Sequence, residues 1–161
     1  HLILMRLSII LVITSLCNAQ SFILDTNRSS VNFEIITPVG SILADGELVG
    51  GRLNKGKGGG AELEVTGRNL SLKTGSISAR AMVNALFSKV LNSPVFAKGI
   101  VGQNGRAEAT IQAQGHTHKR TIPVTFNEIS KDEIQLVGRF PREDILSLEG
   151  SAVFNLYFAR S

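Results

Sequence analysis

Two histidines, one residue apart, are the side chains best placed for metal or acid–base chemistry. His116 and His118 stand in the stretch QGHTHKRTIPVTFN. Residues two apart on a strand share a face, so both imidazoles could reach one metal ion. A zinc site needs further ligands, however, and neither His1 nor any carboxylate has a spacing that points to the pair. Gly115 and the alternating apolar residues on both sides indicate a hairpin connection, so we predict a turn here and no metal site.

Two other patterns that often mark chemistry are better explained by loops. Residues 55–60 read KGKGGG, whereas a phosphate-binding loop needs Gly-Lys followed by Ser or Thr and then a helix. This run leads into an alternating segment from Ala61, which predicts a hairpin tip with its lysines in solvent. No serine lies in a Gly-x-Ser-x-Gly turn of the kind that presents a nucleophile. The sequence gives no catalytic residue, and we expect no enzyme.

Residues 1–19 have the pattern of a secretory signal peptide. From Met5, which we expect to be the true start, the sequence reads MRLSIILVITSLCNA. It has one basic residue, an apolar run too short to span a bilayer as a retained helix, and a small residue at its end. Cleavage after Ala19 would export residues 20–161 to the periplasm or the medium and would remove Cys17, the only cysteine. Attachment of a lipid to Cys17 is the alternative.

Composition and charge narrow the classes of partner. The 161 residues are enough for one domain with a substantial core. The net charge of +4 would suit an anionic membrane surface, and that contact is left open, as is a homodimer. Nucleic-acid binders usually show a basic stripe interleaved with stacking aromatics. Here the basic residues are scattered, Trp is absent and there is one Tyr, so we expect no nucleic-acid partner.

Period-two alternation of apolar and polar residues predicts a mainly β fold. Each run has one apolar and one polar face, as antiparallel strands have when one side meets a core and the other meets water. We predict about eight such strands. The apolar faces are Val31/Phe33/Ile35, Ile42/Ala44/Leu48, Ala61/Leu63/Val65, Ala107/Ala109/Ile111/Ala113, Ile122/Val124/Phe126, Ile134/Leu136 and Ala152/Phe154/Leu156/Phe158.

One segment departs from this rhythm. Between Ser78 and Leu91 the apolar residues recur at spacings of three and four, which predicts an amphipathic helix that ends before Pro94. Many one-sided strands either close into a barrel or pack as a sandwich. The alanines along residues 107–113, if they face inward, would leave room for one small ligand in an eight-stranded barrel. Close packing of the helix against them is the alternative.

Several short motifs, taken in order, resemble the YceI-like family of exported lipid-binding proteins. FILD followed by SVNFEI resembles that family's first strands, LSLKTG before Arg80 its serine-leucine-x-threonine stretch, and LNSPVF the segment after its helical turn. GRAEATI and GHTHKRTIPV are similar to its hairpin, and FPREDI to its late R-x-D-F-G element. The resemblance covers most of residues 22–158. Ala-Met-Val follows Arg80 where the family often has Asp-x-His, and Ile145-Leu146 replaces Phe-Gly.

The resemblance implies a fold and a function for residues 20–161. The fold is an eight-stranded antiparallel lipocalin-like β-barrel with one α-helix between strands. The function is to hold a long apolar molecule, a polyisoprenoid or an isoprenoid quinone, for transport, storage or an envelope stress response. No other cofactor is implied. The alternative is a non-enzymatic envelope protein with a filled barrel that acts through its basic surface.

Candidate ligand-binding residues come from the apolar strand faces and the helix stripe. For each of them ordinary core packing is the alternative. They are Phe33, Leu63, Val65, Met82, Leu86, Phe87, Ile111, Phe126, Phe154 and Phe158.

Overall fold

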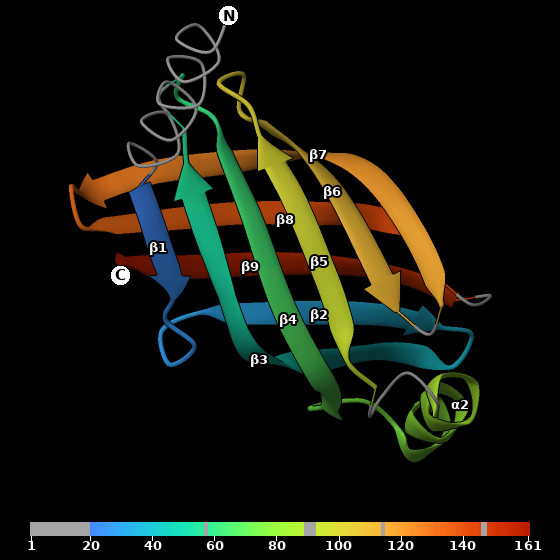
Figure 1. The fold of residues 1–161 in the computed structure, drawn as a ribbon. Helices are drawn as coiled ribbons and strands as arrows, with labels where there is room; N and C mark the ends of the chain where they lie inside the picture. The colour runs from blue at the N-terminus through green and yellow to red at the C-terminus, as the bar shows by residue number, and fades with distance from the viewer. Residues whose placement is uncertain (1–19, 57, 89–92, 114, 146–147) are drawn as a thin grey trace, which may run out of the picture.

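The computed structural model describes residues 20–56, 58–88, 93–113, 115–145 and 148–161. The expected signal peptide and Cys17 lie outside these residues. The elements, in chain order, are β1 (Gln20–Leu24), β2 (Ser30–Thr37), β3 (Gly40–Lys55), β4 (Ala61–Leu72), α2 (Ile77–Phe87), β5 (Val95–Val101), β6 (Arg106–Ala113), β7 (His116–Ser130), β8 (Glu133–Ile145) and β9 (Leu148–Arg160). Figure 1 shows the strands wrapping around one interior, with α2 at one end. Within the described residues no helix is long and apolar enough to cross a membrane.

The strands form one closed antiparallel barrel. Their order is β1-β3-β2-β9-β8-β7-β6-β5-β4, and pairing of β3 with β4 closes the ring. β1 and β2 occupy one position between β3 and β9: β1 pairs with residues 52–55 of β3 and β2 with residues 40–45. Nine strand segments therefore make an eight-stranded barrel, and the predicted fold class is confirmed.

A short turn joins β1 to β2 without leaving the barrel wall. The Asp25 carboxylate accepts hydrogen bonds from the backbone N–H groups of Asn27 and Arg28, and the Asp25 N–H donates to the Tyr157 carbonyl. The Ser29 hydroxyl accepts a 2.8 Å hydrogen bond from the Tyr157 N–H. An aspartate that bonds the backbone two and three residues on stabilises such a turn. Both ends of the turn are thereby fixed to β9, so two short strands continue one another.

Two irregularities bend the β3–β4 hairpin. Pairing shifts between Gly46 and Glu47, where Asn69 of β4 has a left-handed φ of 52°, and again between Leu48 and Gly50. The Glu47 carboxylate accepts hydrogen bonds from the Arg68 guanidinium and the Asn69 amide. The bond from Arg68, and then that from Asn69, lowers the pKa of Glu47 below its ordinary value. These contacts hold the bulged backbone in place, and bulges of this kind let long strands curl into a barrel.

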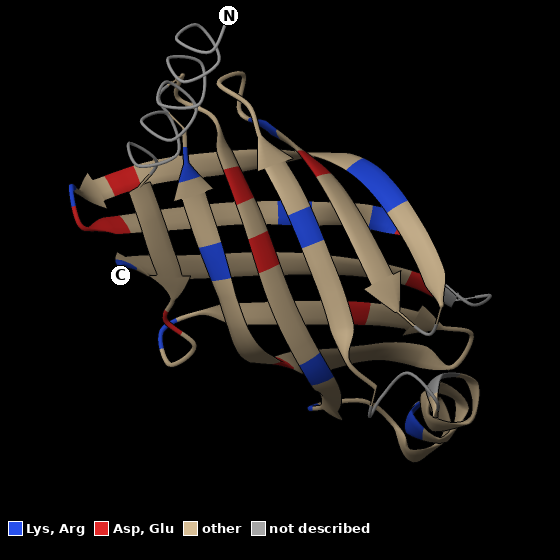
Figure 2. Cartoon of the chain, viewed as in Figure 1, with Lys and Arg blue, Asp and Glu red and all other residues tan. Residues whose placement is uncertain are grey.

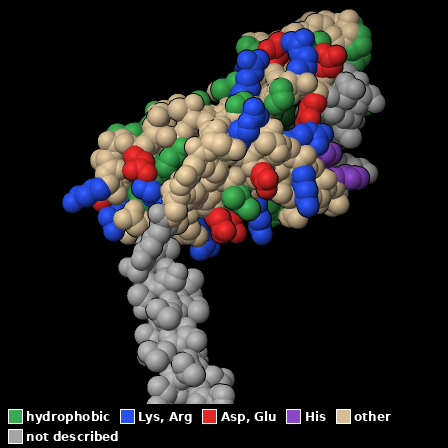
Figure 3. Space-filling model, turned by 90° about the horizontal axis from the view of Figure 1, so that it is seen from above, with side chains coloured by type: hydrophobic (Ala, Val, Ile, Leu, Met, Phe, Trp, Pro, Cys, Tyr) green, Lys and Arg blue, Asp and Glu red, His purple; other side chains and the backbone are tan. Residues whose placement is uncertain are grey.

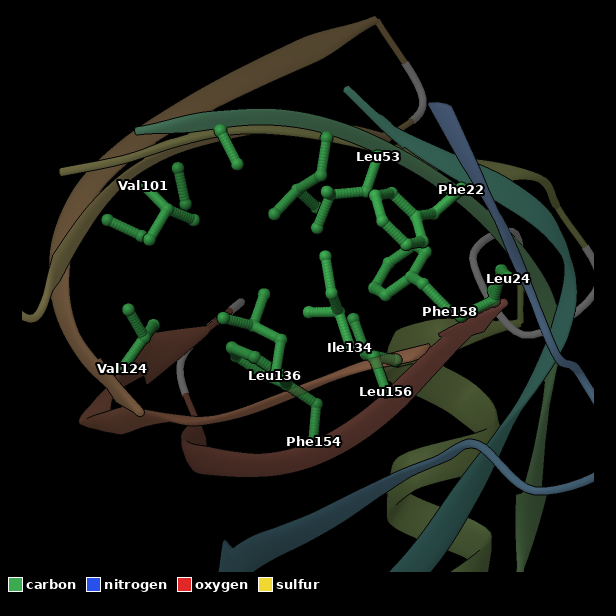
Figure 4. Close-up of a cluster of buried hydrophobic side chains, with 14 of the residues drawn as sticks. Phe22, Leu24, Leu53, Val101, Val124, Ile134, Leu136, Phe154, Leu156 and Phe158 are labelled. Carbon is green, nitrogen blue, oxygen red and sulfur yellow. The ribbon is translucent and has the colours of Figure 1, made fainter. Parts of the chain in front are cut away.

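A packed core fills one end of the barrel, which we call the β1 end. Figure 4 shows Phe22, Leu53 and Phe158 on one side of it and Val124, Leu136 and Phe154 on the other, all pointing inward. The buried cluster comprises Phe22, Leu24, Leu53, Ala61, Leu63, Val101, Ala107, Ala109, Ile122, Val124, Ile134, Leu136, Phe154, Leu156 and Phe158. It is the largest block of apolar burial among the described residues and the main source of stability.

An ion pair lies across the β1 end. Lys55 of β3 bonds Glu128 of β7, and these two strands are not neighbours in the sheet. Lys55 pairs with the buried Ala61, so its side chain starts on the inner face of the wall. The prediction that the lysines of the KGKGGG tip lie in solvent is therefore wrong for Lys55, whose side chain is 24% exposed; Lys57 lies outside the described residues. The hairpin itself is confirmed, with Gly56 donating to the Gly60 carbonyl.

The helix lies at the opposite end, which we call the α2 end (Figure 1). The Ser76 hydroxyl caps α2 by accepting a hydrogen bond from the Ala79 N–H. Ala79 and Val83 pack against Ile35 of β2 and Ile42 of β3, which face inward. The predicted helix is confirmed as far as Phe87, and residues 89–92 are outside the described part of the chain.

Candidate ligand-binding interior

Side chains that face inward at the α2 end keep accessible surface. Residues paired across neighbouring strands share a face of the sheet, so the pairing register identifies the inner wall. One row runs from Val65 through Ala97 and Ile111 to His118, and the next from Gly67 through Val95 and Ala113 to His116. All the apolar members of these rows are only partly buried. The same strands are fully buried farther along, at Leu63, Val101, Ala107 and Ile122. The interior is therefore packed at the β1 end and accessible at the α2 end.

The opposite wall of the α2 end is also apolar and built around small residues. Phe33 of β2 pairs with Ala152 of β9 and with Ala44 of β3. Gly46 lies against Val31 and Phe33, so closely that an added Cβ would stand 2.8 Å from a Val31 methyl carbon. The small residue at position 46 makes room for the Val31 and Phe33 side chains on this wall.

The inner wall also carries charge. Arg120 of β7 pairs with the buried Ala109, and Glu143 of β8 pairs with the buried Gly150, so both side chains face inward. The Arg120 Nε donates a 2.6 Å hydrogen bond to the Glu143 Oε2, and its Nη1 donates to the Lys119 carbonyl. The two side chains are 43% and 32% exposed, which means that water reaches this part of the interior.

The histidines begin β7, directly after the turn at Gly115, whose φ is 74°. The predicted hairpin is confirmed; the preceding residue, 114, is outside the described set. His116 and His118 pair with Ala113 and Ile111, so they lie on the inner face, and both are exposed. Figure 3 shows histidine side chains at the surface, at one end of the molecule. Among the residues that the structure describes, no three His, Cys, Asp or Glu side chains form a group that could hold a metal ion.

The structure separates the ten predicted ligand-binding residues by depth. All seven that lie on strands face inward. Phe33, Val65 and Ile111 are partly buried on the wall of the α2 end, and Val65 also packs against the core. Phe126 is partly buried too, but it lies past Val124 toward the β1 end and packs against the core. Leu63, Phe154 and Phe158 belong to the packed core, with Phe158 fully buried.

The three helix candidates lie beside the α2 end. Met82 packs against the cluster of Ile35 and Ile42. Leu86 is 44% exposed. The Phe87 side chain lies outside the described part of the structure.

Several residues of this interior were not predicted as ligand-binding residues. Arg120 is in phase with Ile122, Val124 and Phe126 along β7, so strict alternation would have placed it inside. Glu143 could not be found in this way, because pairing shifts between Phe140 and Glu143 reverse the phase. The sequence therefore contains a signal that places Arg120 inside and none that places Glu143 there.

A separate hollow of about 500 Å³ lies on the outer face of the barrel. It opens to solvent beside Ile23, Arg52, Glu64 and Thr66, which alternate with inward-facing residues. Basic and acidic residues are likewise interspersed along the strands in Figure 2. The hollow combines one cation, one anion and one exposed apolar residue without a reactive group, so the interior is the stronger candidate site.

No protein-family model and no curated protein matches the chain. Among solved structures, it is similar to a polyisoprenoid binding domain from Saccharophagus degradans implicated in plant cell wall breakdown. The sequences are 14% identical, the TM-score is 0.57, and the match covers 88% of this chain and 99% of that one. The barrel fold implied by the resemblance to the YceI-like family is therefore confirmed.

Proposed function

We propose that this protein is an exported lipid-binding protein that holds a long apolar, isoprenoid-type molecule inside its barrel. The observation that carries the proposal is the accessible apolar inner wall at the α2 end, above a packed core that closes the other end. Phe33, Val65 and Ile111 face inward yet are only partly buried, so a bound hydrocarbon could cover the rest of their surface. The likeness in fold to a polyisoprenoid binding domain supports the same assignment.

Burial of hydrocarbon alone can supply the affinity. At about 0.8 kcal/mol per buried carbon, one five-carbon unit contributes roughly 2–4 kcal/mol before the entropy of association is subtracted. Several units would therefore bind tightly without any polar contact to the tail. A polyisoprenoid or an isoprenoid quinone fits this requirement, and its release to a partner or membrane would serve transport, storage or an envelope stress response.

Native mass spectrometry of the purified full chain tests the proposal. We expect a bound lipid. Organic extraction should release it and return the protein to its unliganded mass. An apolar fluorophore such as N-phenylnaphthylamine should enter the delipidated barrel and be displaced by farnesol. Absence of a co-purifying lipid together with absence of farnesol binding would overturn the proposal. The mass of the mature protein tests export, because cleavage after Ala19 leaves a chain that starts at Gln20.

A further inference from the structure

The inner face of β7 changes from polar to apolar along its length. Starting at the α2 end, His116, His118 and Arg120 are exposed, whereas Ile122 and Val124 are buried in the core. All five side chains point to the same side of the sheet, because they alternate along one strand. A molecule in the accessible part of the interior would meet these donors on β7 and the apolar row of Val65, Ala97 and Ile111 on the adjoining strands.

Two charged side chains, Arg120 and Glu143, stand on an inner wall that is otherwise mostly apolar. Taking a charge out of water is costly unless it is paired, and an apolar pair in its place is often at least as stable. Arg120 and Glu143 are paired and partly hydrated. They thus mark the depth at which the interior becomes wet, which is where the polar part of a bound amphiphile would lie.

Donors outnumber acceptors at this position. Glu143 engages the Nε of Arg120, and the Lys119 carbonyl engages Nη1. Among the described residues Nη2 makes no hydrogen bond, and a guanidinium Nη2 carries two N–H donors. The imidazoles of His118 and His116 add further N–H donors toward the rim. Among the described residues, Glu143 is the one acidic side chain that faces inward at the α2 end and can offset the positive charge of Arg120.

We propose that the ligand is an amphiphile with an anionic headgroup, a phosphate or a carboxylate, and that Arg120 binds this headgroup. His118 and His116 assist at the rim, and Glu143 orients the guanidinium so that its free edge faces the interior. This inference rests on the proposed function, since it concerns the head of the molecule whose tail the barrel holds. Charge-assisted hydrogen bonds to a planar guanidinium are the strongest and most directional contacts available here.

Three probes that share one tail test the inference: farnesyl phosphate, farnesoic acid and farnesol, each competing with N-phenylnaphthylamine. We expect at least one anion to bind the wild-type chain about tenfold more tightly than the alcohol. Whichever anion binds more tightly identifies the headgroup. Equal binding of all three would overturn the inference and leave the proposed function intact, whereas absence of binding by all three would overturn the proposed function.

A neutral pair of variants separates the headgroup contact from folding. Arg120→Gln combined with Glu143→Gln keeps a hydrogen-bonding pair and leaves no charge unpaired. The preference for the anion should fall to within about threefold, with a urea midpoint close to that of the wild type as the sign of an intact barrel. His118→Asn should weaken anion binding by a smaller factor. Lys119→Gln is the matched control, because Lys119 pairs with Thr110 on the outer face and its loss should leave the preference unchanged. Retention of the full preference in the double variant would refute the assignment.

Discussion

The claim that the α2 end of the barrel is accessible to a ligand can be tested by enlarging two alanines on the same wall. Ala97 of β5 and Ala107 of β6 both face inward. Ala107 is 3% exposed within the packed core, whereas Ala97 is only partly buried, between Val65 and Ile111. Replacement of each by phenylalanine adds the same ring at two depths.

The expected costs differ because the surroundings differ. Forcing extra carbons into a filled core costs about 1–3 kcal/mol, so Ala107→Phe should lower the free energy of unfolding by at least that amount. A ring added at Ala97 enters accessible space, and the free energy of unfolding should change by no more than about 0.5 kcal/mol. The same ring occupies space that the ligand tail would use. Losing the contacts of one five-carbon unit costs roughly 2–4 kcal/mol, which weakens binding by about 30- to 700-fold.

The assay is urea denaturation of the delipidated proteins, followed by displacement of N-phenylnaphthylamine by farnesol. Ala97→Phe should unfold at nearly the wild-type urea concentration and bind farnesol poorly. If Ala97→Phe destabilises the protein as much as Ala107→Phe does, the interior is solid at the α2 end and the argument for a lipid carrier is refuted. Unchanged farnesol binding in a stable Ala97→Phe protein would place the ligand elsewhere.

Three further substitutions test the contacts that shape the barrel. Gly138→Ala puts a Cβ 2.2 Å from the Phe154 ring and should cost about 1–3 kcal/mol in urea denaturation, with partial recovery when Phe154→Leu is added. Asp25→Ala removes two hydrogen bonds to the β1–β2 turn and should cost about 1 kcal/mol, while Asp25→Asn should cost less because its amide oxygen still accepts. Glu47 has a lowered folded pKa, so its stabilisation is present above the ordinary value of 4.5 and is lost as pH falls through the folded value. The stability difference between wild type and Glu47→Gln should therefore be present at neutral pH and disappear in acid, and a difference that persists at low pH would contradict the assignment.

Alternation predicted the faces of the strands well because a strand has only two faces. Val31, Phe33 and Ile35 were expected on the apolar side and do face the interior. Alternation does not give depth along the barrel axis, since a core residue and a lining residue have the same period. Phe33 and Phe158 are identical side chains on inner faces, yet the first is accessible and the second is buried. Only the register of all eight strand positions distinguishes them.

The closing of the barrel needed contacts that sequence patterns do not carry. The sequence shows Asp25 only as one residue of a short motif. In the fold its carboxylate bonds the turn, and its backbone N–H donates to the carbonyl of Tyr157, which lies far along the chain on β9. The Arg120–Glu143 pair depends in the same way on a shift of pairing near Phe140. A bulge changes the face of every residue beyond it, so one unpredicted bulge is enough to hide a site.

The division of the barrel into a packed end and an accessible end follows from what stabilises it. Residues 20–161 contain no cysteine, so no disulfide stabilises the barrel and burial of apolar side chains must do so. Each cavity in a core reduces that stability in proportion to its volume. A barrel that leaves inward-facing side chains partly exposed at one end must therefore gain its stability at the other, where the cluster around Phe22 and Phe158 is packed. Under the proposed function, a ligand at the α2 end would restore part of the apolar burial that this end lacks, and binding would therefore stabilise the fold.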